Sequence, residues 1–335
     1  MFNNKSLLIT GATGTFGTAF IEYLLKNYKP KRVVVFSRDE LKQFIMKKTF
    51  SENKFKCLRY FIGDVRDLNR LKMATFGIDF LIHAAALKHV ESSEYNPLEC
   101  IKTNIHGAEN VIEASLHNNI KKVIALSTDK AVNPLNFYGT TKLVSDKLFV
   151  AANNFYGKKD TRFSVVRYGN VANSRGSIIP YFNSLIKRKY KFFPVTDKNM
   201  TRFWIAKNDA VKFVINSFNR MHGGEIFVPK LKSFKIVDLC KSMDKTKNIK
   251  FVGIKPGEKI HESLADPAEL SNTLEFKNFF SIIPSNNLNI PRKRYFKSKN
   301  GEIGRLAKNT LEYYSGEKKY LLNLQQLKKL ISKSS

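Results

Sequence analysis

A glycine-rich segment near the start of the sequence constrains the fold more strongly than any other feature. Residues 10–17 have the sequence TGATGTFG, between an apolar run at 7–10 and a segment with apolar residues at helical spacing. A strand, a glycine turn and a helix in this order are typical of the first part of a βαβ unit. Glycine lets the backbone approach a pyrophosphate there, and the helix N-terminus offers free N–H groups to it. The segment therefore predicts a dinucleotide-binding turn.

Short apolar runs recur through the first half of the chain. They lie at 32–36, 61–62, 80–82, 123–126 and 162–167, and helical patterns lie between them, for example at 104–116 and 138–155. Buried strands that alternate with helices are typical of a parallel sheet covered on both faces. We predict an α/β fold with three parts: a Rossmann-like, doubly wound parallel sheet over 1–168, a smaller, mainly substrate-binding C-terminal domain over 169–290, and a basic C-terminal tail over 291–335.

Charge and cysteine usage bear on the class of partner. The chain has 58 Lys and Arg against 28 Asp and Glu, a net charge of +30. This balance suits nucleic acid, an anionic membrane or a phosphorylated substrate. The basic residues are spread along the whole chain, so we do not expect nucleic-acid binding, although a nucleic-acid binder stays one hypothesis. Three scattered cysteines indicate neither a disulfide framework nor a zinc site. With no apolar run of membrane-spanning length, we expect a cytoplasmic protein without a metal or a membrane partner.

The end of the second apolar run bears on the choice of dinucleotide. It ends with Ser37, Arg38 and Asp39, and Lys42 follows one helical turn later. An acidic residue at this position would bind a ribose 2′-hydroxyl, whereas an arginine accommodates a 2′-phosphate. Ser37 can donate to such a phosphate, and Arg38 and Lys42 can neutralise it. We therefore predict NADP rather than NAD, with the nearby Asp39 as the argument for NAD.

Two pairs of ionisable residues lie where such a domain would bind its substrate. Tyr138 and Lys142 are four residues apart on a predicted helix and share one face, so the ammonium group is expected to favour the phenolate. Thr128, Asp129 and Lys130 directly follow the fifth apolar run, at the sheet edge where α/β proteins bind ligands. Asp129 and Lys130 are an acid–base pair on this interpretation, or a solvated loop pair on the alternative one. His83 and His89 are interpreted as structural.

An acid and a base in addition to Tyr138 favour an elimination on a sugar. Oxidation at C4 would make the C5 proton acidic, Lys130 would remove it, and Asp129 would protonate the departing C6 hydroxyl. Thr128 would hydrogen-bond the reacting hydroxyl. Burial and neighbouring positive charge are expected to lower the pKa of Lys130, and desolvation is expected to raise the pKa of Asp129.

Several motifs resemble one known family. The GxxGxxG spacing of Gly11, Gly14 and Gly17 resembles the extended short-chain dehydrogenase/reductase superfamily. Within it, the chain resembles the inverting UDP-N-acetylglucosamine 4,6-dehydratases over about residues 5–265. The matching segments are 37–42, 63–67, 83–89, 95–97, 126–130, 167–171, 174–177, 200–203 and 256–262. Tyr138 and the segment 222–229 are similar to the branch that opens pseudaminic acid synthesis.

The resemblance implies an activity and a set of site residues. The activity is NADP-dependent dehydration of UDP-N-acetylglucosamine with inversion at C5, by a homo-oligomer. The elimination step of the family falls on Asp129 and Lys130. Expected substrate contacts are Lys88, Asn170, Arg202 and Glu258, with a structural loop as the alternative for Glu258. Expected cofactor contacts are Gly11, Thr13, Gly14, Thr15, Phe16, Gly17, Ser37, Arg38, Lys42, Asp64, Val65, Ala84, Ala86, Tyr138 and Lys142.

An epimerase on the same scaffold is the alternative enzyme. It would act at C4 or C5 of a nucleotide sugar and would need no acid for a leaving group. An Asp129→Asn substitution without effect on turnover would favour it.

Overall fold

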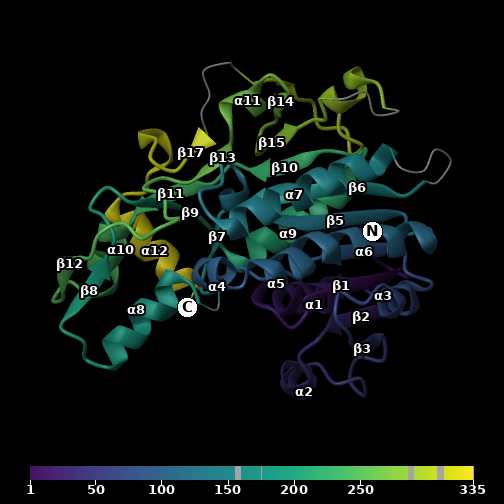
Figure 1. The fold of residues 1–335 in the computed structure, drawn as a ribbon, viewed down its shortest axis with the longest axis horizontal. Coiled ribbons are helices and arrows are strands. Elements are labelled where there is room, and N and C mark those ends of the chain that lie inside the picture. Colours follow the sequence, from purple (N-terminus) through teal and green to yellow (C-terminus); the bar gives the residue numbers. More distant parts are fainter. Residues whose placement is uncertain (155–159, 175, 286–289, 308–312, 335) are drawn as a thin grey trace.

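A parallel sheet forms the middle layer of the protein (Figure 1). The computed structural model describes residues 1–154, 160–174, 176–285, 290–307 and 313–334. Ten strands form one sheet. In sheet order they are β16 (Arg305–Leu306), β14 (Thr273–Glu275), β15 (Phe279–Ile282), β10 (Ile226–Pro229), β6 (Arg162–Tyr168), β5 (Lys122–Thr128), β4 (Phe80–His83), β1 (Ser6–Thr10), β2 (Arg32–Ser37) and β3 (Leu58–Ile62).

The topology confirms the predicted fold class. All pairs from β10 to β3 are parallel, and the order β3-β2-β1-β4-β5-β6 is that of doubly wound, dinucleotide-binding domains. The order reverses next to β1, so a crevice opens at the carboxyl ends of β1 and β4. This edge is where the predicted glycine turn and the segment after His83 lie.

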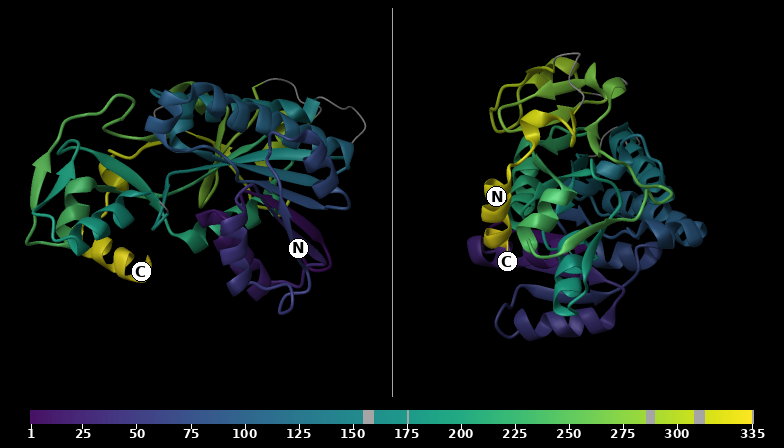
Figure 2. Two further views of the ribbon diagram at one scale, coloured as in Figure 1. Left: turned by 60° about the horizontal axis from the view of Figure 1, so that its bottom comes forward. Right: turned by 90° about the vertical axis from the view of Figure 1, so that its left-hand side faces the viewer.

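Helices cover both faces of the sheet, as the left view of Figure 2 shows. On one face α1 (Thr15–Asn27) packs against α9 (Lys207–Arg220). On the other face α3 (Leu68–Thr75), α6 (Gly107–His117) and α7 (Phe137–Ala151) pack side by side. The shorter helices of this part are α2 (Glu40–Thr49), α4 (Val90–Tyr95), α5 (Pro97–Ile101) and the π-helix η1 (Lys102–His106).

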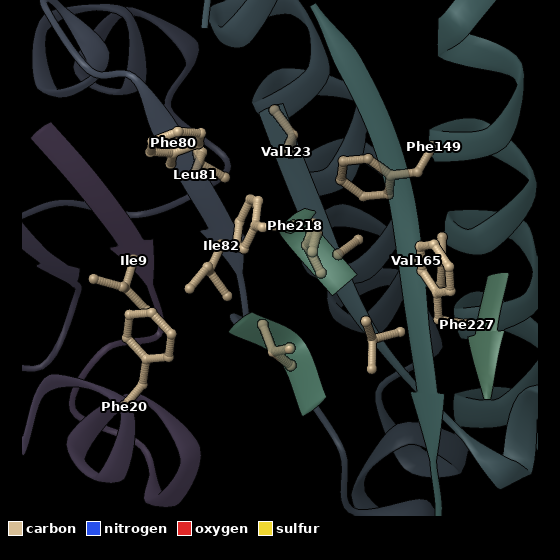
Figure 3. Close-up of a cluster of buried hydrophobic side chains, with 14 of the residues drawn as sticks. Ile9, Phe20, Phe80, Leu81, Ile82, Val123, Phe149, Val165, Phe218 and Phe227 are labelled. Carbon is tan, nitrogen blue, oxygen red and sulfur yellow. The ribbon is translucent and has the colours of Figure 1, made fainter. Parts of the chain in front are cut away.

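The main core lies between these three layers. Strand side chains from neighbouring positions in the sheet meet aromatic rings of the helices, as Figure 3 shows for Ile9, Ile82, Val123, Val165, Phe149 and Phe218. Phe2, which is fully buried, places its ring 5.8 Å from Phe218 and 5.5 Å from Phe80. The apolar runs that predict strands are thus the residues that bury most completely, which is typical of a sheet covered on both faces.

A second, smaller hydrophobic cluster lies in the C-terminal half. A three-stranded sheet joins β11 (Lys232–Lys235), β9 (Thr201–Ile205) and β7 (Asn170–Val171), and a separate pair joins β12 (Asn248–Phe251) to β8 (Phe192–Val195). The helices α8 (Ile178–Lys187), α10 (Ile236–Met243) and α12 (Leu324–Ser334) pack around them. Among the described residues, no helix is long and apolar enough to cross a membrane.

The structure has two units, the ten-stranded sheet with its helices and the smaller C-terminal cluster. The chain crosses between these two units more often than the three expected parts imply. Strand β10 extends the main sheet beyond residue 168 by pairing with β6. Residues 291–334, expected as a basic tail, contribute β16 to the main sheet and α12, with its buried Leu327, to the small cluster. In α12 the apolar residues Leu324, Leu327 and Leu330 recur at helical spacing among lysines, which was a usable signal for an amphipathic helix.

Candidate active site

The glycine turn has the geometry that a bound pyrophosphate needs. Gly11 has φ +63, a left-handed conformation that favours glycine, and a Cβ there would come within 2.8 Å of the Ala85 backbone. A Cβ on Gly17 would lie 2.3 Å from the Ala12 carbonyl oxygen. No side chain caps α1 at Gly14. The turn is therefore a backbone cradle in front of a helix N-terminus.

One cavity of about 780 Å³ begins at this cradle and follows the carboxyl ends of the strands. Its volume is that of a ligand site for a cofactor with part of a substrate. Every predicted cofactor residue lines it, and so do the predicted residues Lys88, Asn170, Thr128 and Lys130. The structure thus brings together residues from eight segments of the predicted motif set, which are 11–17, 37–42, 64–65, 84–86, Lys88, Thr128 with Lys130, Tyr138 with Lys142, and Asn170.

The end of β2 presents hydroxyl and guanidinium groups to the cavity. The Gln43 side chain donates to the Ser37 hydroxyl oxygen at 3.1 Å, which leaves the hydroxyl proton available to a ligand. Arg38 lies 3.8 Å from Asp64 and is about half exposed. The Asp39 carboxylate caps α2 by accepting from the Lys42 backbone N–H at 2.8 Å, and it also pairs with the Lys42 ammonium. The Asp39 carboxylate thus makes both of these contacts within its own helix.

His83 is a structural residue of the strand behind the cavity. Its Nδ1 lies 2.9 Å from the Thr10 hydroxyl, which joins β4 to β1. Burial, and secondarily the Lys142 ammonium, lower the pKa of His83 to about 3, so the imidazole is neutral at physiological pH. The described residues contain no group of His, Cys, Asp and Glu side chains placed to hold a metal.

Asp129 and Lys130 lie together in a buried turn and not in a solvated loop. They form a 3₁₀ turn, η2 (Asp129–Ala131), directly after β5. Asp129 is 1% exposed, and its Oδ1 accepts from the Thr128 hydroxyl at 2.9 Å and from Lys130 Nζ at 3.2 Å. Lys130 is the member of the pair that opens on the cavity. This arrangement removes the solvated-pair alternative.

The ionisation of the pair agrees with one expectation and contradicts the other. Burial raises the pKa of Asp129, as expected, although the Lys130 charge offsets part of the rise. Burial alone would lower the pKa of Lys130, but the carboxylates of Asp129 and Glu262 outweigh it and raise that pKa. The expected lowering is therefore wrong, because Lys130 lies between two carboxylates.

Tyr138 and Lys142 share one face of α7, as the spacing predicts. The helix begins at Phe137, where the Asn136 side chain accepts from the Gly139 N–H at 2.8 Å. Burial raises the pKa of Tyr138 to about 12, against the opposite effects of Lys130 and of a hydrogen bond with Thr128. The charge of Lys130 thus acts in favour of the phenolate. Burial lowers the pKa of Lys142.

Two predicted substrate residues lie outside the lining of this cavity. The Glu258 carboxylate accepts from the Thr196 hydroxyl at 3.1 Å and from the Lys255 N–H at 3.3 Å, which fits the structural-loop alternative. The Arg202 guanidinium donates to the carbonyl oxygens of Thr201 and Ile260 at 2.7 and 3.2 Å. In the matching segment 174–177, Arg175 lies outside the described residues.

The structure adds two buried acids that the sequence analysis did not single out. Glu262 places Oε1 3.1 Å from Lys130 Nζ. Asp146 accepts from the Ser127 hydroxyl at 2.7 Å and lies 3.4 Å from Arg167. The position of Asp146, four residues after Lys142, continues the Tyr138–Lys142 face by one turn and was a usable signal. Glu262 belongs to a matching segment, but nothing in its local sequence indicates its contact.

Three comparisons bear on the family. The profile described as polysaccharide biosynthesis protein matches residues 7–284. A Campylobacter jejuni protein (subsp. jejuni serotype O:23/36, strain 81-176), named UDP-N-acetylglucosamine 4,6-dehydratase (inverting), is 54% identical over 315 residues, 94% of this chain and 93% of that protein. A Rickettsia bellii protein (strain RML369-C), named UDP-glucose 4-epimerase, is 40% identical over 338 residues, 99% of this chain and 96% of that protein.

A solved structure agrees with the sequence relatives. The X-ray structure of Pen from Bacillus thuringiensis has a TM-score of 0.88 and 36% identity, covering 99% of this chain and 98% of that one. The resemblance inferred from the motifs is therefore confirmed over nearly the whole chain. This chain belongs to the polysaccharide biosynthesis protein family, and within it to the group of the inverting UDP-N-acetylglucosamine 4,6-dehydratases, which are hydro-lyases.

Proposed function

We propose that this protein is an NADP-dependent hydro-lyase that dehydrates UDP-N-acetylglucosamine across C5 and C6 and inverts C5. The product would be UDP-2-acetamido-2,6-dideoxy-β-L-arabino-hex-4-ulose. One observation carries the proposal: Asp129 and Lys130 are buried as a pair at the carboxyl end of β5, and Lys130 opens on the cavity that Tyr138 and Lys142 also line. A simple redox enzyme or a C4 epimerase has no use for this second acid–base pair. The name of the Campylobacter jejuni relative supports the choice of substrate.

The residues of the cavity fit a nicotinamide dinucleotide. A Cβ on Gly11 would collide with the Ala85 backbone and a Cβ on Gly17 with the Ala12 backbone, so this turn, which would hold the pyrophosphate, can form only with glycine at both positions. A nicotinamide dinucleotide held by the glycine turn, Tyr138 and Lys142 would supply reversible hydride transfer, which the oxidation at C4 and the reduction at C6 require. The free Ser37 hydroxyl proton and Arg38 support NADP, and the commitment of Asp39 to α2 weakens the argument for NAD. Arg38→Ala should therefore weaken binding of NADP about tenfold or more and leave NAD binding nearly unchanged.

The chain's own residues would move three protons. Tyr138 would accept the C4 hydroxyl proton, with Thr128 and Lys130 stabilising the phenolate, while Lys142 binds the nicotinamide ribose. Lys130 would then remove the C5 proton, and its electron pair would go to the C4 carbonyl oxygen as an enolate. Asp129 would give its proton to the departing C6 oxygen, which leaves as water. A further proton, added to C5 from the opposite face as C6 is reduced, would complete the inverted 4-keto product.

The Lys130–Asp129 contact explains how a lysine with a raised pKa can act as a base. One proton passing from Nζ to Oδ1 across 3.2 Å converts the ion pair into an amine and a carboxylic acid. These are the two states that the elimination requires. The two groups therefore titrate as a pair, and the proton that leaves Lys130 is the one that Asp129 donates.

The resemblance also supports a place for this reaction at the start of pseudaminic acid synthesis, in a cytoplasmic homo-oligomer. Tyr138 and the segment 222–229 carry this part of the proposal. Detection of a tight oligomer by light scattering, and of pseudaminic acid loss on deletion of the gene, would test it. A monomer, or an unchanged sugar, would count against it.

The experiment that tests the function is the mass of the product. The purified protein is incubated with UDP-N-acetylglucosamine and NADP, and the products are separated by mass spectrometry. We expect a nucleotide sugar lighter by one water. A product of unchanged mass would instead support the epimerase, which the name of the Rickettsia bellii relative favours. Asp129→Asn should lower dehydration on the order of 10²-fold or more, whereas an epimerase would not depend on this residue.

A further inference from the structure

Glu262 is a buried acid with a direct contact to the proposed base. It directly precedes β13 (Ser263–Ala265), and its backbone is held by Ser315, whose hydroxyl accepts from the Glu262 N–H at 2.9 Å. Its side chain is 3% exposed, with Oε1 3.1 Å from Lys130 Nζ and 3.8 Å from Arg202 Nε. Its Oε2 is buried without a hydrogen-bond partner among the described residues.

Stability alone does not account for this carboxylate. A buried ion pair gains little over an apolar pair of similar size, and an unsatisfied buried oxygen has a further cost. The same carboxylate contacts Lys130, the lysine of η2, whose side chain opens on the cavity. The free-energy cost of burying the Glu262 carboxylate therefore falls next to Lys130, the proposed base.

We propose that Glu262 is a positioning residue for the elimination, which orients the Lys130 amino group toward sugar C5 and sets, through its charge, the pH range in which Lys130 accepts a proton. The inference rests on the proposed function, because it concerns the same base.

The hydrogen-bond geometry explains the orienting role. A neutral lysine amine has two N–H donors and one lone pair. Donation to Glu262 Oε1 at 3.1 Å holds one N–H group, and the contact with Asp129 Oδ1 at 3.2 Å opens when the Asp129 O–H turns to the C6 oxygen. The lone pair is then left for the side that faces the cavity. When the C5–H bond breaks, its proton forms the third N–H bond and its electron pair moves into the enolate.

Charged groups on four segments face this cluster. Lys130 is flanked by Asp129 and Glu262, and its charge also acts on Tyr138 and Lys259. Burial would raise the pKa of Glu262, but Lys130 and Arg202 outweigh it and lower that pKa, so the group stays ionised. Arg202, anchored to two backbone carbonyls, offsets part of the negative charge beside Lys130. This position gives Arg202 a role in the same cluster.

Two substitutions separate the effect of the Glu262 charge from the effect of its side-chain length. Glu262→Gln keeps a hydrogen-bond acceptor near Lys130 but removes the charge, so the acid limb of the pH profile of kcat/KM should move to lower pH by about one unit or more. Glu262→Asp keeps the charge but withdraws the oxygen, so kcat should fall about tenfold or more while the limb stays within about half a unit. Glu225→Gln is the matched control, since Glu225 is buried among Ser164 and backbone amides away from the cavity.

The outcomes are distinct. The inference is supported if the acid limb of the kcat/KM profile moves in Glu262→Gln but stays in place in Glu262→Asp and in Glu225→Gln. An unmoved limb in a folded Glu262→Gln overturns it and leaves Glu262 a packing residue. If Glu262→Gln does not fold, Glu262→Asp decides, because unchanged kcat there also overturns the inference. A wild-type protein that forms no dehydrated sugar refutes the proposed function instead, before any variant is compared.

Discussion

At the scale of single residues, His83 couples the site to the stability of the fold. The Thr10 hydroxyl accepts from the N–H groups of Ala84 and Ala85, so its own proton points to His83 Nδ1. A protonated imidazole would need an acceptor at this place and would find none. The neutral ring is therefore part of the contact between β1 and β4.

This contact predicts a dependence of stability on pH. The folded-state pKa of His83 is lowered to about 3 from 6.5, so its contribution is complete above pH 6.5 and is lost as the pH falls toward 3. Between pH 7 and 4.5 the loss should be about 2–3 kcal/mol, at about 1.4 kcal/mol per pKa unit. Urea unfolding of His83→Gln should show a pH dependence smaller by this amount. An equal pH dependence in both proteins would contradict the assignment.

The sequence predicts local residue relations and not distant ones. Tyr138 and Lys142 share a helix face because their spacing dictates it, and Asp129 adjoins Lys130 in the chain. The expected direction of the Lys130 pKa was wrong because two carboxylates outweigh burial, Asp129 next to it in the chain and Glu262 from a segment far along the sequence. The contacts of Arg202 with Ile260 and Glu262 are likewise set by the packing of β9 against the segment before β13, so they have no local signal.

At the scale of elements, η2 can lie close to α7 because residue 139 is a glycine. A Cβ on Gly139, in the first turn of α7, would lie 2.2 Å from the Lys130 carbonyl oxygen. Alanine normally stabilises a helix relative to glycine by about 1 kcal/mol. Here the clash is with backbone, so the turn that carries Asp129 and Lys130 would have to move away from Tyr138.

Gly139→Ala should therefore be destabilising and inactivating. We expect a loss of about 1–3 kcal/mol in the free energy of unfolding and a fall in kcat of about 10²-fold. Thr140→Ala is the neighbouring control, because Thr140 is exposed and should change stability by no more than about 0.5 kcal/mol. Urea unfolding and initial rates measure both effects. A fully active, more stable Gly139→Ala protein would show that the contact is not important.

Helix and strand patterns predict the elements of the first half well. The runs at 32–36, 80–82 and 123–126 all lie in strands of the sheet, since continuous apolar runs suit strands buried on both faces. The helix expected at 104–116 instead begins as the π-helix η1 before α6. Asn104, inside η1, bonds the Leu87 backbone and the Thr141 hydroxyl. Such tertiary contacts have no local signature.

At the scale of the whole molecule, Tyr313 joins the two units. Its ring centroid lies 5.0 Å from Phe203 of β9 and 5.2 Å from Phe280 of β15, and the side chain is fully buried. Its hydroxyl accepts from the Leu231 N–H and donates to the Pro229 carbonyl oxygen at 3.1 Å. One residue of the expected tail thus contacts both sheets.

Removal of this ring should uncouple the units. Trp204, the single tryptophan, lies in the small cluster, so its fluorescence reports unfolding there, whereas far-UV circular dichroism follows mainly the large sheet. The two transitions in urea should coincide in the wild type and separate in Tyr313→Ala, with the fluorescence change at lower urea. Tyr313→Phe should cost only about 1–3 kcal/mol and keep them coincident. Coincident transitions in Tyr313→Ala would refute this coupling role.

The doubly wound sheet was predictable from the sequence, and the path of the last third was not. Periodic apolar runs and a glycine turn suffice to predict the first six parallel strands, which are neighbours in the sheet. Strand β10 pairs with β6, and β15, β14 and β16 follow outward from β10 in antiparallel pairs. The short lengths of β14, β15 and β16 give no independent signal.

The central claim is that Lys130 removes a proton from C5 of the sugar. The measurement is proton NMR of the product formed from UDP-N-acetylglucosamine and NADP in deuterated water, by the wild type and by Lys130→Met. Solvent deuterium at C5 of a 4-keto-6-deoxy product from the wild type, and none from a Lys130→Met protein that still binds NADP, is the predicted result. Protium at C5 in the wild-type product, or full turnover by Lys130→Met, would contradict the account.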